Sequence, residues 1–207
     1  MWFNCLITIF TAYMLGNLNG AFLVGYRVAG EDIRKKGSGN AGLTNFIRNF
    51  GAPPAVMVIA TDMGKAVLAC LVGGGLLAPF GHEIAGRALG GMVVILGHAF
   101  PALLGFRGGK GILSGFAVAL AIDWRIAAII LAVFALAYVT TGYVSLGSVL
   151  GAVMFAVGFA VFHHDNVTVM VGGIFIGVLA VLLHHGNILR LIKGQERKTN
   201  LFKKKTE

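Results

Sequence analysis

Charged residues are scarce in this sequence, at 12% of the chain, and only 8 residues are acidic. Soluble domains carry about 25% charged residues, so a water-soluble globular fold is close to excluded. Hydrophobic residues make up 57% of the chain, which excludes a disordered protein, because disordered chains are polar. The two cysteines, Cys5 and Cys70, stand at no metal-binding spacing, and they predict no disulfide framework.

The charge that is present is mostly positive. The 17 Lys and Arg residues outnumber the 8 Asp and Glu residues and give a formal net charge of +9 and a pI near 10.0. A basic chain can bind nucleic acid, but in so apolar a sequence a membrane is the better explanation. We therefore expect a lipid bilayer as partner and no nucleic acid.

Long apolar stretches recur along the whole chain and predict an all-α polytopic membrane bundle. A helix needs about 20 apolar residues to cross a hydrocarbon core of about 30 Å. The stretch at 111–122 covers only about half of that core, so a re-entrant segment is the alternative there. We predict spans at 2–26, 54–77, 88–104, 111–122, 125–140, 144–162 and 167–185.

The distribution of basic residues predicts the orientation. Five lie in 27–53, two in 105–110 and seven after 186, so seven crossings with the N-terminus outside would place fourteen of the 17 in the cytoplasm. Six crossings would separate the last group from the first. We therefore expect seven transmembrane helices, some of them short, in one integral-membrane domain over 1–207. Residues 195–207 would form a basic cytoplasmic tail, and the first apolar stretch would be a retained span.

The first of three polar segments is 36–48. It combines flexible glycines with side-chain donors and contains no carboxylate. Ser38 is a good N-cap for a helix starting near Asn40, and a helix N-terminus with free amides binds anions. An ordinary polar loop is the alternative. The candidate donors are Ser38, Asn40, Thr44, Asn45 and Arg48.

The second polar segment, 97–111, places Arg107 and Lys110 among glycines. It is not a Walker A loop, since that motif would require Gly at position 104 and Ser or Thr at 111, where the chain has Leu104 and Gly111. A pair of cations in a glycine-rich loop still predicts a phosphate clamp. A basic membrane-anchoring loop is the alternative.

The third polar segment, 184–194, closes the last predicted span. His184 and Asn187 lie three residues apart, on one face of a helix. Arg190 and Lys193 are explained equally well as topology determinants. All three segments fall on the predicted cytoplasmic side, and so many donors with so few acids favour a ligand that carries one or two phosphates.

Other catalytic arrangements are missing. No histidine is followed by Asp five residues later, and no G-x-S-x-G elbow occurs. The His163-His164-Asp165 run lies on the predicted outer side and makes only a weak case for a metal. Asp62 and Lys65 lie three apart within a span, where buried charges suggest function. A structural pair that fixes helix packing is an equal alternative.

Together the three segments resemble the small integral-membrane glycerol-3-phosphate acyltransferases of bacteria, which use acyl phosphate as donor. The resemblance rests on GSGNAGLTNFIRNFG (37–51), GHAFPALLGFRGGKG (97–111) and HHGNILRLIKGQE (184–196). It implies a seven-span enzyme of the bacterial cytoplasmic membrane with its site facing the cytoplasm. The enzyme would transfer an acyl group to the 1-hydroxyl of glycerol 3-phosphate, giving lysophosphatidic acid and phosphate, without a coenzyme A thioester, a metal or another cofactor.

The resemblance also implies roles for individual residues. Those expected to support the transfer are Ser38, Arg48, Lys110, His184 and Asn187. Those expected to bind substrate or phosphate are Gly37, Gly39, Asn40, Thr44, Asn45, His98, Arg107, Gly108, Gly109, Ser145 and Arg190.

This inventory is rich in donors and poor in bases, which leads to a hypothesis about mechanism. No protein nucleophile forms an acyl-enzyme, and a phosphate oxygen of the donor takes the hydroxyl proton. The rival function is a small transporter or binding protein for a phosphorylated metabolite or anionic lipid. Transporters tend to show repeated halves and midplane sites, whereas this chain has no visible repeat and its polar segments share one face.

Overall fold

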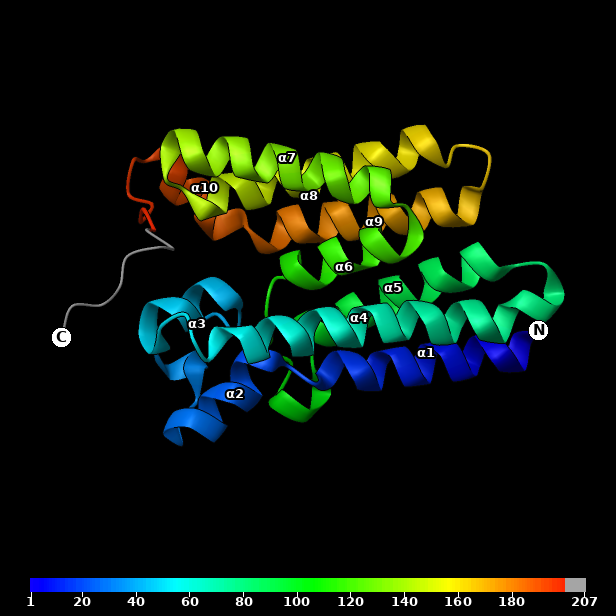
Figure 1. Cartoon of the computed structure of the whole chain (residues 1–207), viewed down its shortest axis with the longest axis horizontal. Coiled ribbons are helices and arrows are strands. Elements are labelled where there is room, and N and C mark those ends of the chain that lie inside the picture. Colours follow the sequence, from blue (N-terminus) through cyan, green and yellow to red (C-terminus); the bar gives the residue numbers. More distant parts are fainter. Residues whose placement is uncertain (200–207) are drawn as a thin grey trace.

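The computed structural model describes residues 1–199, and every regular element in that range is helical (Figure 1). Ten α-helices are joined by short turns and three 3-10 turns. The α-helices are α1 (Trp2–Asn17), α2 (Gly20–Ala29), α3 (Leu43–Phe50), α4 (Ala55–Leu77), α5 (Glu83–Ala99), α6 (Ile112–Ile122), α7 (Trp124–Thr141), α8 (Val144–Phe162), α9 (Val167–Leu183) and α10 (His185–Ile192). The 3-10 turns are η1 (Ile33–Lys35), η2 (Ala78–Phe80) and η3 (Ala102–Leu104).

The long helices form two groups with α6 between them (Figure 1). One group is α1, α4 and α5, and the other is α7, α8 and α9. Close packing within the first group depends on small residues. A Cβ at Gly86 would lie 2.2 Å from the carbonyl oxygen of Gly73, and one at Gly90 would lie 2.2 Å from that of Ala69. Small residues let helix backbones approach closely in lipid.

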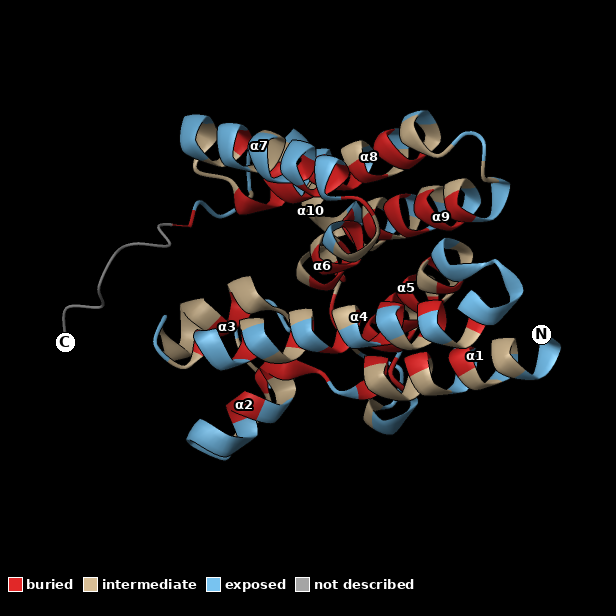
Figure 2. Cartoon of the chain, turned by 45° about the vertical axis from the view of Figure 1, so that its right-hand side comes forward, coloured by how far each residue is buried: buried red, intermediate tan, exposed pale blue. Residues whose placement is uncertain are grey.

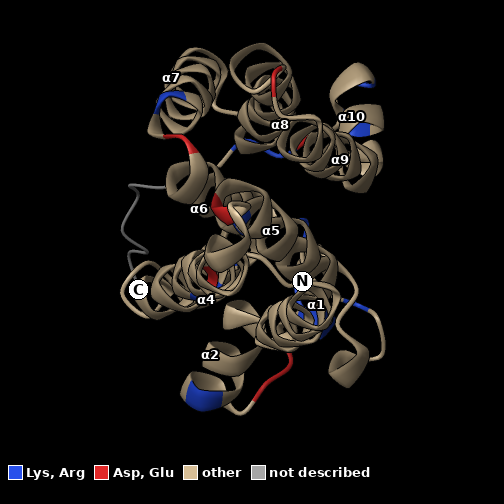
Figure 3. Cartoon of the chain, turned by 90° about the vertical axis from the view of Figure 1, so that its right-hand side faces the viewer, with Lys and Arg blue, Asp and Glu red and all other residues tan. Residues whose placement is uncertain are grey.

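The outside of the bundle is apolar. Large hydrophobic side chains such as Phe3, Leu71, Leu136 and Leu182 are 50–72% exposed, and exposed positions dominate the outward side of α7 (Figure 2). Viewed along the bundle, the ribbons are uncharged over most of their length (Figure 3). A surface of this kind requires lipid rather than water, so the chain is a multi-pass integral membrane protein.

Five predicted spans are confirmed as helices long and apolar enough to cross a membrane: Trp2–Ala29, Ala55–Phe80, Glu83–Leu104, Trp124–Thr141 and Val144–Phe162. The bent pair α9 and α10 makes a sixth if it is one span. The helix in the predicted span 111–122 is α6 (Ile112–Ile122), whose 11 residues do not reach that length. The described residues therefore hold five or six candidate spans rather than seven full-length ones.

Two predicted boundaries are wrong, and one confirmed span is broken in its interior. The stretch 2–26 is two helices that break at Leu18, because Asn19 caps α2 by accepting a hydrogen bond from the Phe22 amide at 2.9 Å. The third span begins at Glu83 rather than at 88. The last span ends at Leu183, and the chain bends by 54° before α10. Of the predicted tail 195–207, residues 200–207 lie outside the described part of the chain.

Candidate active site

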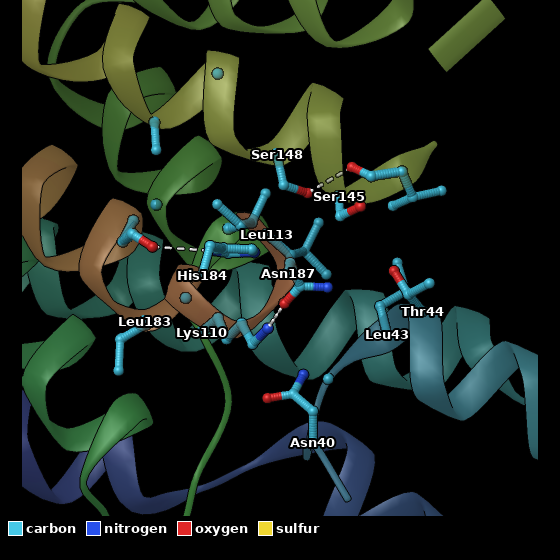
Figure 4. Close-up of a pocket in the computed structure, with 18 of the residues that line it drawn as sticks. Asn40, Leu43, Thr44, Lys110, Leu113, Ser145, Ser148, Leu183, His184 and Asn187 are labelled. Carbon is cyan, nitrogen blue, oxygen red and sulfur yellow. Dashed lines mark hydrogen bonds between the residues drawn. The ribbon is translucent and has the colours of Figure 1, made fainter. Parts of the chain in front are cut away.

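A cavity of about 880 Å³ lies between the two helix groups. It opens at the end of the bundle that carries α3 and α10, where the exposed residues His185, Arg190 and Arg197 line it. All three polar segments of the sequence contribute to its wall, as Figure 4 shows for Asn40 and Thr44, Lys110, and His184 and Asn187. The prediction that the three segments lie on one side is therefore confirmed for the residues that line this space.

The first segment folds around the side chain of Asn45, which is buried. Its amide nitrogen donates to the carbonyl oxygens of Lys36 and Asn40 at 3.1 and 3.0 Å, and its Oδ1 accepts from the Ser38 amide at 3.0 Å. Gly37 and Gly39 adopt left-handed φ values of 58° and 73°, which other residues rarely adopt. The loop backbone is thereby held in a turn that lines the cavity mouth.

The predicted capping role of Ser38 is wrong. The helix begins at Leu43 with Gly42 as N-cap and without a side-chain cap. Gly39, which would be the first residue of a helix capped by Ser38, has a left-handed φ of 73°, and Asn45 Nδ2 donates to the Asn40 carbonyl oxygen, so residues 38–41 stay outside the helix. Ser38 and Asn40 still line the cavity, as do Thr44 and Arg48 of α3.

Arg48 is a half-buried cation at the cavity mouth. Its guanidinium donates to the carbonyl oxygen of Arg197 at 3.2 Å and to the hydroxyl of Thr199. Burial lowers its pKa from the ordinary value, although a guanidinium stays charged at any pH that an enzyme meets. The segment after α10 therefore crosses the cavity mouth. Its Arg197 and Thr199 accept hydrogen bonds from the guanidinium that is predicted to bind phosphate.

The second segment carries Lys110 on a tightly packed glycine turn. The amides of Gly108 and Gly109 donate to the carbonyl oxygens of Ala99 and His98 at 3.2 and 3.1 Å. A Cβ at Gly108 would lie 1.9 Å from the His98 oxygen, so only glycine fits there. Gly109 and Arg107 do not line the cavity: Gly109 is buried against His98, and Arg107 is exposed.

Lys110 points into the cavity and donates to Oδ1 of Asn187 (Figure 4). Burial, then the charge of Arg190, lowers the pKa of the Lys110 ammonium to about 8, while Glu196 opposes the shift. An ammonium that is partly desolvated and surrounded by donors binds an anion more strongly than a surface lysine does.

The third segment brings its side chains together at the bend between α9 and α10. His184 is buried, and its Nδ1 lies 2.7 Å from the Ala180 carbonyl oxygen, so Nδ1 is the protonated nitrogen. Nε2 of a neutral His184 is then an acceptor. Asn187 Nδ2 donates to Glu196 at 2.9 Å, and Arg190 Nε donates to the other oxygen of the same carboxylate at 2.7 Å.

Sequence reasoning missed Glu196 as a site residue. Its carboxylate lines the cavity and lies against Asn187 and Arg190. Burial would raise the pKa of Glu196, but the hydrogen bonds from Arg190 and Asn187 outweigh burial and lower it. The signal was its position at the end of the third motif, where it is the first acid after Asp165.

The predicted Asp62–Lys65 pair is confirmed, and it belongs to a larger buried polar cluster. The two charges lie 2.7 Å apart and are 3% exposed. Lys65 also donates to His98 Nδ1 and to the Leu18 carbonyl oxygen, each at 2.8 Å, while Asp62 accepts from the Gly20 amide at 3.0 Å. The cluster fixes α4 to the break between α1 and α2 and to α5, which favours the structural alternative. Asp62 and His98 also line the cavity.

The histidines between α8 and α9 form a separate contact. His163 Nε2 lies 3.2 Å from Asp123, which caps α7. Within residues 1–199, no group of three or more His, Cys, Asp or Glu side chains is placed to hold a metal ion.

The chain is similar throughout its length to proteins of known activity. The family profile described as "Glycerol-3-phosphate acyltransferase" matches residues 6–194. Proteins of that name from Clostridioides difficile (strain 630) and Shouchella clausii (strain KSM-K16) are 38% and 34% identical to it over 198 residues each. These matches cover 95% and 94% of this chain and 96% of each relative.

Two crystal structures have the same fold. Both are of PlsY (YgiH), an integral membrane glycerol 3-phosphate acyltransferase. The glycerol 3-phosphate form is 29% identical with a TM-score of 0.83, and the match covers 96% of this chain and 99% of that one. The lysophosphatidic acid form is 28% identical with a TM-score of 0.79, over 95% and 96%.

Proposed function

The chain belongs to the glycerol-3-phosphate acyltransferase family and makes lysophosphatidic acid, and we propose that it does so with acyl phosphate as donor in the cavity described above. The observation that carries the proposal is the division of that cavity. Its mouth holds cations and side-chain amides, while the part between α6, α7, α8 and α9 is mostly apolar. One ligand with a phosphate head and an acyl chain fits both parts.

The polar part suits two phosphates. Arg48 and Lys110 supply positive charge, and the side chains of Asn187, Ser38 and Asn40 supply further donors. Glycerol 3-phosphate brings one phosphate and acyl phosphate brings the other. We place both at this end because donors of this kind are scarce elsewhere in the cavity wall, and charge-assisted hydrogen bonds to phosphate are among the strongest in proteins.

The apolar part suits the acyl chain. It is walled by side chains from four helices that point away from water, and burying a methylene contributes about 0.8 kcal/mol. Its lining residues are Leu113 and Phe116 of α6, Ile130, Leu131 and Phe134 of α7, Phe155 of α8, and Ile176 and Ala180 of α9.

The chemistry requires position and charge more than a protein nucleophile. An acyl phosphate is an activated mixed anhydride. The 1-hydroxyl oxygen of glycerol 3-phosphate bonds to the acyl carbon, the bond from that carbon to the phosphate oxygen breaks, and the hydroxyl proton goes to a phosphate oxygen. Holding the two reactants together supplies about 7–11 kcal/mol, and Arg48 and Lys110 stabilise the leaving phosphate.

His184 is the alternative proton acceptor. Its Nδ1 is engaged with Ala180, which leaves Nε2 facing the site with a lone pair. In His184→Gln, loss of roughly 10²–10⁴ in kcat at unchanged KM would assign the base to His184. A smaller loss supports proton transfer to the donor's own phosphate. Trapping an acyl-enzyme with donor alone would contradict direct transfer.

For the orientation, we propose seven crossings with the N-terminus outside and the site facing the cytoplasm of a bacterial cell. The six candidate spans plus α6 give seven. The basic stretch 27–53, with α2 and α3, lies at the end where the cavity opens, as does α10 (Figure 1), and Lys110 of the second basic loop lines the same cavity. The positive-inside rule favours the cytoplasm for that end.

The test is a reconstituted transfer assay. Purified protein is mixed with glycerol 3-phosphate and either acyl phosphate or acyl coenzyme A, and lysophosphatidic acid is measured. Lysophosphatidic acid is expected with acyl phosphate and not with acyl coenzyme A, and the Lys110→Ala substitution should nearly abolish its formation. Lys193→Ala is the matched control, because Lys193 is exposed and does not line the cavity. Product from acyl coenzyme A alone, or a Lys110→Ala protein at the wild-type rate, would overturn the proposal.

A further inference from the structure

The apolar part of the cavity has a closed end. Along α8 its lining residues begin at Val144, at the site end, and stop at Phe155, eleven residues further on, or about 16 Å deeper. One turn beyond lies Phe159, which is 1% exposed and stacks on Phe155 with ring centroids 4.8 Å apart. A Cβ at Gly173 would lie 2.2 Å from the Phe159 ring, so α9 packs tightly there.

The neighbouring helices close the space at the same depth. On α7 the lining stops at Ile130, and the next residue on that face, Ile126, is fully buried against Gly158 of α8. On α9 the deepest lining residue is Ile176. The ring of Phe155 therefore lies on tightly packed side chains, and with Ile130 and Ile176 it forms the floor of the apolar part.

On the α6 side, space remains above this floor. A Cβ built at Gly115 would have one neighbour within 4 Å, the Cε2 atom of Phe155 at 4.0 Å. A side chain at 115 would consequently extend over the Phe155 ring into the cavity instead of striking a backbone. Phe155 at the floor and Gly115 on the α6 wall therefore both limit how deep the cavity is.

We propose that Phe155 and Gly115 determine the length of acyl chain that this enzyme accepts. The proposal rests on the proposed function, because it assumes that the acyl chain of the donor occupies the apolar part. A chain that reaches the Phe155 ring has all its methylenes buried. Each further methylene has no apolar space to enter and loses its transfer free energy, which corresponds to roughly fourfold in kcat/KM.

The experiment measures kcat/KM for acyl phosphates of increasing chain length. Phe155→Ala deepens the cavity and should move the optimum to longer donors, whereas Gly115→Leu fills it and should move the optimum to shorter ones. Val153→Ala is the control, because Val153 lies on α8 but is 38% exposed and does not line the cavity. Its optimum should match the wild type. Phe155→Leu serves if the alanine variant does not fold.

Opposite shifts in the two variants, with an unchanged KM for glycerol 3-phosphate, support the proposal. An unchanged optimum in Gly115→Leu together with an unchanged optimum in a folded Phe155 variant overturns it, and means that the chain leaves sideways between α6 and α7. A wild-type protein that forms no lysophosphatidic acid from any acyl phosphate contradicts the proposed donor instead, so the two failures are distinguishable.

Discussion

Lys110 gives the transfer reaction a pH dependence that follows from its surroundings. Burial, then the charge of Arg190, lowers the pKa of its ammonium from 10.5 to about 8, against the opposing effect of Glu196. The ammonium is therefore about 90% charged at pH 7 and about 10% charged at pH 9. Because only the charged form holds a phosphate, kcat/KM should fall as the pH rises through 8, by about tenfold per unit above it.

The assay measures initial rates of lysophosphatidic acid formation across the neutral and alkaline range, with the hydrolysis of acyl phosphate subtracted from a blank without protein. The pH dependence of kcat/KM reports the free enzyme, and that of kcat reports the enzyme with substrate bound. The alkaline fall should lie near pH 8 in kcat/KM and at higher pH in kcat, because a bound phosphate stabilises the ammonium.

Lys110→Arg decides the assignment, because a guanidinium keeps its charge throughout this range. The variant should be slower, since the planar fork does not reproduce the contact with Asn187, but its kcat/KM should not fall near pH 8. Lys193→Arg should keep the wild-type profile. A fall near pH 8 that persists in the Lys110→Arg protein would refute the assignment, and a wild-type profile that stays flat to pH 10 would refute the lowered pKa.

Two further predictions concern the support of the site. Gly109→Ala puts a Cβ 2.2 Å from His98 Nε2 and 2.7 Å from the Ala41 carbonyl oxygen, so the loop must move and kcat/KM should fall about 10²-fold; Gly64→Ala, which meets nothing within 4 Å, should keep the wild-type rate. Lys65→Met leaves the Asp62 carboxylate buried without its cation and should destabilise the protein by about 3–5 kcal/mol, measured as thermal unfolding in detergent. Adding Asp62→Asn should recover much of that loss, and a double variant no more stable than Lys65→Met would contradict the ion-pair explanation.

The sequence predicts most of what depends on local pattern. Apolar runs of sufficient length mark the spans, and three donor-rich segments mark the cavity mouth. The errors occur where a distant or non-local side chain competes. Ser38 has the right residue type for an N-cap, but Gly39 is left-handed and the Asn45 side chain binds the Asn40 carbonyl oxygen, so no helix begins there. His98 joins Lys65 from 33 residues away, a pairing that no spacing rule contains.

Glu196 illustrates a second limit. In sequence it is one of two acids in a basic tail, where the pattern predicts a solvated residue. In the structure the bend at His184 turns α10 so that Asn187 and Arg190 both donate to its carboxylate. The bend, rather than the residue type, makes Glu196 part of the cavity wall. A bend of 54° between two helices cannot be predicted from a hydropathy profile.

The shortness of α6 explains why Lys110 is half-buried instead of exposed at the surface. In sequence order α6 runs away from the cavity mouth to the turn at Asp123, and α7 runs from that turn back toward the mouth, so the two helices are antiparallel neighbours (Figure 1). With 11 and 18 residues they are about 16 and 27 Å long. Ile112, the end of α6 nearer the mouth, therefore lies about 10 Å deeper than Thr141. The loop 105–111 must cover that depth without a helix.

Irregular backbone at membrane depth is tolerated only where its polar groups are satisfied inside the protein or line a water-filled space. The Gly108 and Gly109 amides meet this requirement by bonding back to the end of α5, and their missing side chains make the close approach possible. The next residue, Lys110, is thereby placed below the ends of α7 and α8, where burial lowers its pKa to about 8. Extending α6 by two turns would bring Lys110 to the surface, raise its pKa and remove the cation from the proposed phosphate site.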